Sequence, residues 1–216
     1  ASKMIASIIE SSKKSGFPFI YTVPNKVSND IFIKLKFEKR TENMIYTINV
    51  KTLPVLKLFN KLKLTSSFTS IFKLLTRKRV MSRNTIHFNN SLIDEGYDGI
   101  IRDNEYYKYK VYGDNFIYKF NDGLIWFKID DGFVIGDISI NDTGNIDSLM
   151  NEFKRFTRKC GIHKIKIFST KKGTLFNYFE RNHSTCEIGI NLLIYPIDKK
   201  IELDNWYTNI PDYNTF

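Results

Sequence analysis

The chain has 216 residues, of which 42% are hydrophobic and 26% charged, and its formal net charge is +10. Enough apolar side chains are present to build one large or two small domains, which excludes wholesale disorder. No run approaches the roughly 20 apolar residues that a membrane-spanning helix needs. The first residues lack the charged-then-apolar pattern of an export signal. We therefore expect a cytoplasmic protein.

The positive charge favours an anionic partner, such as nucleic acid, an acidic membrane surface or a phosphorylated cofactor. No nucleic-acid-reading motif accompanies the charge, so we do not expect DNA binding. The two cysteines, Cys160 and Cys186, lack metal-ligand spacing and are expected to be reduced, buried thiols. The three histidines lie far apart in the sequence, so no metal site is predicted.

The N-terminal quarter of the chain predicts helix, strand, helix and strand. Apolar residues recur on one face of residues 1–14, which indicates a helix. Residues 19–23 are long enough for a buried strand, and Pro24 ends it because proline has no N–H to give to a sheet. Four-residue spacing over 27–35 predicts a second helix, and alternating β-branched and aromatic residues predict a strand at 44–50.

Residues 53–85 differ from their surroundings because they are amphipathic and basic. Seven lysines or arginines lie between Lys57 and Arg79, and Thr65-Ser-Ser interrupts the apolar pattern. We favour a helical connector, packed between two domains with its lysines in solvent. The less favoured alternative is that residues 57–79 lie on an anionic membrane surface.

Residues 86–216 predict a second, longer unit. Strands at 115–120, 124–129 and 133–140 are separated by Asp-Gly turns, which indicate an antiparallel meander. The remaining predicted elements are a helix at 146–159, a strand at 162–168, a helix at 175–179 and a strand at 186–195. The tail, 206–216, is rich in turns and carries aromatic anchors that are expected to pack on the body.

Two parts of the chain follow one plan. Helix, glycine, strand and helix at 1–37 match the same order at 146–182, and both first helices end in a basic turn before Gly16 or Gly161. This offset of about 145 residues indicates two copies of one unit. Three strands precede the second copy and none precedes the first. Either the chain is a fragment that lacks the first copy's N-terminal sheet, which we favour, or the first copy borrows strands.

A spaced set of residues around the first predicted strand resembles the GNAT superfamily of N-acetyltransferases. The family pattern after a strand is Asn-x-x-Ala, an aromatic residue that is usually Tyr, and then x-Lys-x-Gly-Phe. Here Asn25, Ser28, Phe32, Lys34 and Phe37 take these places. The order of elements over 115–195 resembles most of a second GNAT fold.

The likeness extends to tandem GNAT-like proteins of bacterial surface-polysaccharide gene sets. Two short motifs carry it: Arg102-Asp-x-Glu-Tyr106 and the ending Asp212-x-x-Thr-Phe216. The resemblance implies an α/β (α+β) fold of two GNAT-like units, each a mixed twisted sheet with flanking helices. The expected divisions are 1–52 for the incomplete first unit, 53–85 for the connector and 86–216 for the second unit.

The resemblance implies an acyltransferase, expected to be an N-acetyltransferase, that uses acetyl-CoA or another acyl-CoA. The acceptor would be a small amine, such as an amino sugar. By analogy, Ser2 and Lys3 would neighbour the CoA pyrophosphate at a helix N-terminus. A backbone N–H near Val23 would stabilise the oxyanion, and Asn25 would face the pantetheine arm. Ser28 and Phe32 complete the predicted donor-binding set.

Several positions depart from the family pattern. Phe32 has no hydroxyl and so cannot act as the family's Tyr acid, and Lys36 replaces the glycine. In the second copy the turn Asp142-Thr-Gly144 lacks a Gly-x-Gly. We therefore expect the second copy to be a degenerate unit with a structural or acceptor-binding role. No catalytic residue is assigned.

Two other functions stay open. One is a non-catalytic GNAT-like binding module, which the missing Tyr hydroxyl and the missing first sheet favour. The other is an aminoacyl-tRNA-dependent transferase of the related tandem-GNAT type, which would suit the net charge of +10.

Overall fold

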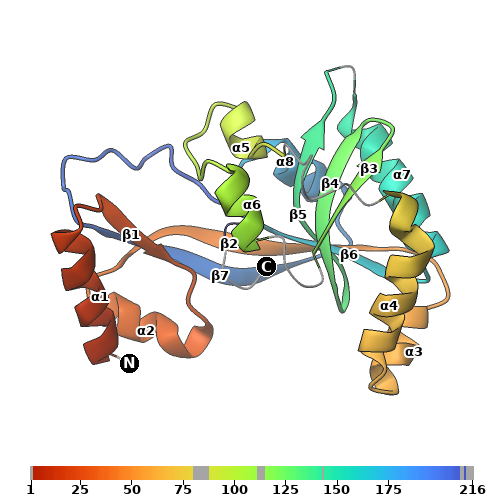
Figure 1. The fold of residues 1–216 in the computed structure, drawn as a ribbon, viewed down its shortest axis with the longest axis horizontal. Coiled ribbons are helices and arrows are strands. Elements are labelled where there is room, and N and C mark those ends of the chain that lie inside the picture. Colours follow the sequence, from red (N-terminus) through yellow and green to blue (C-terminus); the bar gives the residue numbers. More distant parts are fainter. Residues whose placement is uncertain (1, 80–87, 111–114, 143, 210–211, 213–216) are drawn as a thin grey trace.

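A computed structural model describes residues 2–79, 88–110, 115–142, 144–209 and 212. Seven strands of this part of the chain form one continuous sheet in the order β1-β7-β2-β6-β5-β4-β3. Figure 1 shows α1 and α2 at one end of the molecule and α3 and α4 at the other. The strands are β1 (Phe19–Thr22), β2 (Glu38–Asn49), β3 (Asn115–Phe120), β4 (Gly123–Asp130), β5 (Gly132–Ile140), β6 (Lys164–Ser169) and β7 (Thr185–Pro196).

The helices follow the predicted order, with two short additions before the meander. They are α1 (Ser2–Lys14), α2 (Lys26–Lys34), α3 (Val55–Lys61), α4 (Thr65–Thr76), the 3₁₀ turn η1 (Arg77–Arg79), α5 (Ser91–Asp94), α6 (Asn104–Lys110), α7 (Ile146–Lys159) and α8 (Gly173–Asn182). The mixed α/β fold class is confirmed.

Some local predictions need correction. The break in the basic segment lies at 62–64, because Lys63 adopts a left-handed φ of 58° and Thr65 begins α4. The first strand is half-buried, since β1 is the edge strand of the sheet. Cys186 is exposed and Cys160 is only partly buried, so neither is the fully buried thiol that the sequence predicts; in the described residues neither forms a disulfide.

The tail packs on the body through Trp206, as expected. Its ring lies 5.0 Å from the ring of Phe19 and 5.2 Å from that of Tyr21, and it is buried. The later aromatic residues of the tail lie outside the described residues.

The predicted internal repeat is present in the fold. The series α1, β1, α2 and β2 has the same order as α7, β6, α8 and β7. The two first helices also end alike: Phe17 N–H donates to the Ser12 carbonyl, and Ile162 N–H donates to the Thr157 carbonyl. These bonds define the same Schellman cap, in which Gly16 and Gly161 have φ of 72° and 66°.

The two copies exchange their last strands. β7 lies between β1 and β2, and β2 lies between β7 and β6, all in antiparallel pairs. The counterparts in the two copies are β1 with β6 and β2 with β7. If each strand is replaced by its counterpart and the order is read backwards, β1-β7-β2-β6 is unchanged, so the two copies have a pseudo-twofold relation. β1 therefore takes its partner strand, β7, from the second copy. The expectation that the first copy lacks an N-terminal sheet stays a prediction. The two expected sheets are one in the described residues, and the boundaries at 52/53 and 85/86 stay a prediction.

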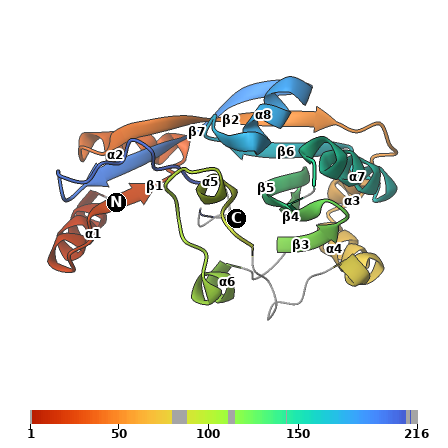
Figure 2. The same cartoon turned by 90° about the horizontal axis from the view of Figure 1, so that it is seen from above.

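Both faces of the meander are covered. On one face α4 and α7 bury a cluster of aromatic rings: Phe72, Phe127, Phe133, Phe153 and Phe156. On the other face Trp126 packs with residues of 88–110, including Phe88 and Tyr107. Figure 2 shows α6 and α4 beside this part of the sheet. Each such ring that leaves water contributes roughly 1.5–3 kcal/mol, so the meander has a substantial core of its own.

The family-like residues at the end of α2 form another Schellman cap. Phe37 N–H donates to the Phe32 carbonyl and Lys36 N–H to the Ile33 carbonyl. The rings of Phe32 and Phe37 meet at 5.0 Å, which is the hydrophobic contact that accompanies this cap. Lys36 has a left-handed φ of 67°, so the position where the family has glycine is one that favours glycine.

We predict that Lys36→Gly stabilises the protein by about 1 kcal/mol, because glycine avoids the steric cost of a left-handed side chain. Lys34→Gly is the matched control, since it places glycine inside α2 and should cost about 1 kcal/mol. Urea unfolding monitored by circular dichroism measures both. A loss of stability in Lys36→Gly would contradict the assignment of this cap.

Candidate functional site

A cavity of 390 Å³ opens at the carboxyl end of β1. Its wall combines residues from both copies of the repeat. From the first copy come Thr22, Val23, Pro24, Asn25, Ser28, Phe32 and Asn43, and from the second unit Lys128, Val134, Phe168 and Ile190.

The structure brings together four of the six residues predicted for the donor site. Val23, Asn25, Ser28 and Phe32 all line the cavity. Ser2 and Lys3 do not; they are exposed residues in the first turn of α1. The contribution of the second unit was missed, because its residues carry no family-like motif.

Asn25 and Ser28 fix the start of α2. The Asn25 Oδ1 accepts hydrogen bonds from Ser28 N–H and from Ser28 Oγ, each at 2.8 Å. Asn25 is thus an N-cap, an interaction typically worth about 1 kcal/mol. The cap uses the amide oxygen, and the residue itself is exposed at the cavity wall. The cap gives a structural reason for Asn25 and Ser28 at these positions, and it also fixes the position of the Asn25 side chain.

Asn43 and Ile190 line the cavity where the β2–β7 pairing is irregular. The register shifts between Glu42 and Met44, opposite Gly189. A Cβ at Gly189 would lie 2.8 Å from the Asn43 carbonyl oxygen, so the close approach requires glycine. Bulges of this kind re-aim side chains and are frequent beside functional sites. Here the bulge lies at the centre of the pseudo-twofold arrangement.

Lys128 brings a titratable side chain to the lining of this cavity. Burial lowers the pKa of Lys128 below its ordinary value of 10.5, and the nearby carboxylate of Asp130 opposes that effect. A lowered pKa raises the share of neutral amine near neutral pH. Such an amine can accept a proton, and in its charged form it can hold an anion.

The equivalent place in the second unit is filled by the chain itself. β5 and β6 pair in parallel only from Phe133 with Ile165 to Ile135 with Ile167. Beyond this point, Asp137 of β5 accepts hydrogen bonds from Ser91 N–H and Ser91 Oγ. α5 and the segments beside it therefore occupy the region where the two strands separate.

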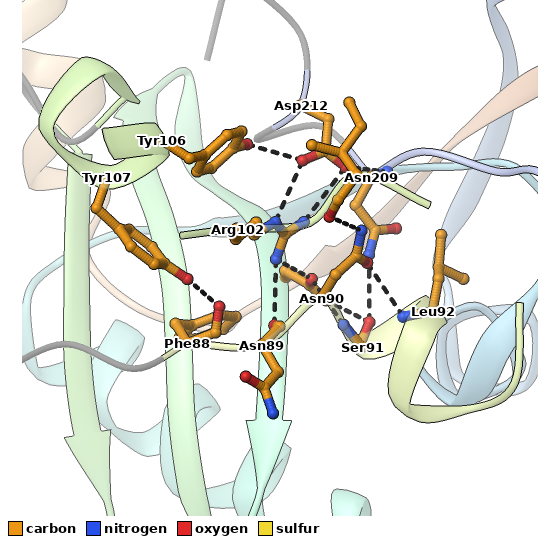
Figure 3. A network of polar contacts seen from close by, with 12 residues as sticks. Phe88, Asn89, Asn90, Ser91, Leu92, Arg102, Tyr106, Tyr107, Asn209 and Asp212 are labelled. Carbon is orange, nitrogen blue, oxygen red and sulfur yellow. Dashed lines mark hydrogen bonds and ion pairs between the residues drawn. The ribbon is translucent and has the colours of Figure 1, made fainter. Parts of the chain in front are cut away.

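A buried ion-pair network holds α5 and the segments beside it in this region (Figure 3). Arg102 Nη1 lies 2.6 Å from Asp137 Oδ2, and Arg102 Nε lies 3.2 Å from Asp212 Oδ1. All three side chains are fully buried. Burial by itself would lower the pKa of Arg102, but the charges of Asp212 and Asp137 raise it well above its usual range. The guanidinium is therefore charged at every accessible pH.

Asp212 joins this network to the first copy. Tyr106 Oη donates to Asp212 Oδ1 at 2.7 Å, and Tyr21 Oη of β1 donates to the Asp212 carbonyl at 3.0 Å. The two short motifs that carried the family likeness, around Arg102 and Asp212, thus contact each other. Tyr106 also packs in one cluster with Val23 and Phe168, which line the cavity.

The helix N-termini of the second unit hold carboxylates of the chain. Glu95 accepts the Thr174 N–H at the start of α8, at 2.9 Å from Oε2. At the start of α7 Asn145 accepts the Asp147 N–H, and Asp122 accepts from Ser148 Oγ. These acceptors and charges oppose a phosphate at either helix. This supports the interpretation that the second unit is a degenerate copy.

Searches of protein families and curated proteins gave no match to the chain. Three solved structures are similar over about nine-tenths of the chain but only about half of their own length. A "Conserved Protein of Unknown Function" from Enterococcus faecalis V583, "Probable N-Acyltransferase", shares 13% identity at a TM-score of 0.52, covering 89% of this chain and 48% of its own.

The other two are described as GCN5-related N-acetyltransferases. The protein from Kribbella flavida has 11% identity and a TM-score of 0.49, covering 91% of this chain and 48% of its own. The protein from Anabaena variabilis has 12% identity and a TM-score of 0.46, covering 91% and 50%. At these identities the likeness concerns the fold alone: the chain shares the mixed α/β fold of the Enterococcus faecalis structure.

We predict that Arg102→Met destabilises the protein by about 3–5 kcal/mol, because two buried carboxylates lose their counter-charge. Arg40→Met is the matched control, since its partner Asp204 is 99% exposed and the pair should contribute less than about 1 kcal/mol. Chemical unfolding measures both. Equal losses of stability in the two variants would show that the Arg102 network does not hold α5 and its neighbours between β5 and β6.

Proposed function

We propose that this chain is part of an acyltransferase that moves an acyl group from acyl-CoA to an amine. The acyl end of the donor would enter the 390 Å³ cavity at the end of β1. One observation carries the proposal: four residues predicted for the donor from sequence alone meet around one cavity, and the second unit supplies a lysine to the same wall.

The donor side belongs to the first copy. The pantetheine arm would pass Asn25, and the apolar ring of Phe32 would contact the acyl group. Ser2 and Lys3, in the first turn of α1, would lie nearest to the pyrophosphate, where helix N–H groups and dipole favour anions. α1 is followed by β1, and the cavity opens at the carboxyl end of β1, so the donor would contact both elements.

The acceptor side belongs to the second unit. Val134 and Phe168 provide apolar walls, and the buried Asn43 provides an amide at the junction. A small amine with polar substituents, such as an amino sugar, fits this mixture of surfaces. This assignment gives the degenerate second copy an acceptor-binding role.

Lys128 is assigned the role of general base. The acceptor nitrogen attacks the thioester carbonyl, a C–N bond forms, the C–S bond breaks and CoA leaves as the thiolate. The proton lost by the nitrogen goes to the neutral amine of Lys128, whose share is increased by the lowered pKa. A thiolate is a good leaving group, which lessens the need for the hydroxyl that Phe32 lacks.

Two alternatives remain as second candidates. A non-catalytic binding module is supported by Phe32 and by β1, which has no neighbouring strand on its outer edge among the described residues. An aminoacyl-tRNA-dependent transferase is supported by the net charge of +10. The enzyme proposal includes a cytoplasmic location, because the enzyme would need a source of acyl-CoA.

Calorimetry of the full natural protein that contains this chain separates these functions. We expect saturable binding of CoA, weakened about ten-fold by Asn25→Leu, which keeps the side-chain size but removes the amide. Asn145→Leu is the control: it removes an asparagine cap of the same kind, that of α7, and should leave CoA affinity unchanged. No detectable CoA binding would refute the acyl-CoA proposal and favour one of the two alternatives.

Lys128→Met should lower kcat by about 100-fold or more and leave the affinity for CoA unchanged, because the base acts on the acceptor. Lys119→Met, on the exposed side of neighbouring β3, is the control and should keep full activity. Steady-state assay of thiol release measures both. Full activity in Lys128→Met would exclude Lys128 as the base.

Lys128→Met should also change how the stability of the protein depends on pH. Since the pKa of Lys128 is lower in the folded protein, its ammonium destabilises the fold at neutral pH, and this cost disappears as the pH rises toward 10.5. Lys128→Met should therefore be at least as stable as the wild type at pH 7, with a difference that narrows as the pH is raised. Thermal melts across this range check the sign.

A further inference from the structure

The positive charge of the protein is concentrated in one stretch. Residues 43–93 contain nine lysines and arginines and no aspartate or glutamate. The rest of the chain is nearly balanced, with 24 basic against 23 acidic residues. The net charge of +10 is therefore a local property of the basic segment, and it needs a local explanation.

The same segment exposes large apolar side chains on α3, α4 and the turn between them. Leu53, Leu62, Leu74 and Leu75 are 80%, 59%, 66% and 77% exposed. Next to them, Phe59, Phe68 and Phe72 line a groove of 740 Å³ that also reaches Lys78 and Arg158. A connector packed between two domains would bury these leucines, so the structure does not support the packing that we expected for 53–85.

Figure 1 places α3 and α4 side by side at one end of the molecule, and α1 and α2 at the other. In the second view α4 again lies at this end, beyond the edge strand β3 (Figure 2). The surface is thus separate from the cavity at the end of β1, and its residues are absent from that cavity's wall.

We propose that the α3–α4 surface binds the face of an anionic lipid membrane. The exposed leucines would enter the boundary between headgroups and acyl chains, and the basic side chains would contact anionic headgroups. Apolar residues surrounded by lysine and arginine, with no acidic residue in the stretch, are the complement of such a surface.

Two features favour a membrane over other anionic partners. Nucleic acid is bound through basic and hydrogen-bonding side chains, and it offers nothing to several exposed leucines. The four leucines are 59–80% exposed and no acidic residue lies in 43–93, so the surface combines apolar insertion with positive charge, as peripheral helices on anionic membranes do. The contact is peripheral, since among the described residues no helix is long and apolar enough to cross a membrane.

Sedimentation with vesicles tests the proposal on the purified protein. We expect binding to vesicles of phosphatidylcholine with about 30% phosphatidylglycerol, weak binding to pure phosphatidylcholine, and marked weakening between about 0.1 and 0.5 M NaCl. No binding to the anionic vesicles would overturn the proposal.

Two variants separate the apolar and the charged contributions. Leu62→Ser/Leu74→Ser/Leu75→Ser and Lys61→Gln/Lys73→Gln/Arg77→Gln/Lys78→Gln should each weaken vesicle binding by at least about 30-fold. All seven of these residues are exposed, so melting temperatures should change little.

Matched controls outside the α3–α4 surface have the same chemistry. Met4→Ser/Val27→Ser/Ile188→Ser removes equally exposed apolar groups, and Lys14→Gln/Lys34→Gln/Lys199→Gln/Lys200→Gln removes the same charge. Both should bind as the wild type does. Equal weakening in the controls would show that net charge or general hydrophobicity decides binding, and the proposal would fail. A dimer in light scattering that only the leucine variant abolishes, without vesicle binding, would assign the surface to a second copy instead.

Discussion

The antiparallel pairing of β2 with β7 decides where the other strands can lie. Each of these strands ends one copy of the repeat, and each is placed between strands of the other copy. The exchange makes one sheet from two units and brings the carboxyl end of β1 close to the meander. It also produces the bulge at Asn43 and Gly189, beside which the cavity opens. Without this pairing the cavity residues of the first copy would have no opposite wall.

The two copies have the same plan but different surroundings. In the second, Asp137 stands where β5 and β6 separate, and Arg102 and Ser91 hold α5 and its neighbours in that space. In the first, the comparable region remains a cavity, with Lys128 from the second unit in its wall. A buried charge is costly unless it is paired and hydrogen-bonded. Here both carboxylates contact the Arg102 guanidinium, Asp212 also accepts from the Tyr106 hydroxyl, and Asp137 accepts from Ser91. The second copy is therefore held closed by this network, whereas the first copy has a cavity at the end of β1.

Much of this fold could be predicted from local sequence. Periodicity and turn residues gave the order of helices and strands, since α7 and the meander have strong amphipathic and Asp-Gly patterns. The matching of Gly16 with Gly161 indicated the repeat. Strand exchange was not predictable in the same way, because pairing between residues 151 positions apart, such as Thr41 with Leu192, depends on long-range packing that no local pattern records.

The candidate site was only half visible from sequence for a related reason. Asn25, Ser28 and Phe32 lie close together in the chain and match a family pattern, so one stretch was enough to find them. Lys128 lies on a strand where a lysine usually faces solvent, and only the tertiary arrangement brings it to the cavity. The basic segment shows the opposite case: its composition was plain, but whether its leucines were covered could be decided only from the structure.

The central claim is that the open first copy, and not the filled second copy, receives the acyl donor. A crystal structure of the full natural protein with acetyl-CoA tests this most directly. The account predicts density for the thioester in the cavity between Asn25, Phe32 and Lys128. Density for the thioester between β5 and β6, with Asp137 and Arg102 displaced from each other, would contradict it.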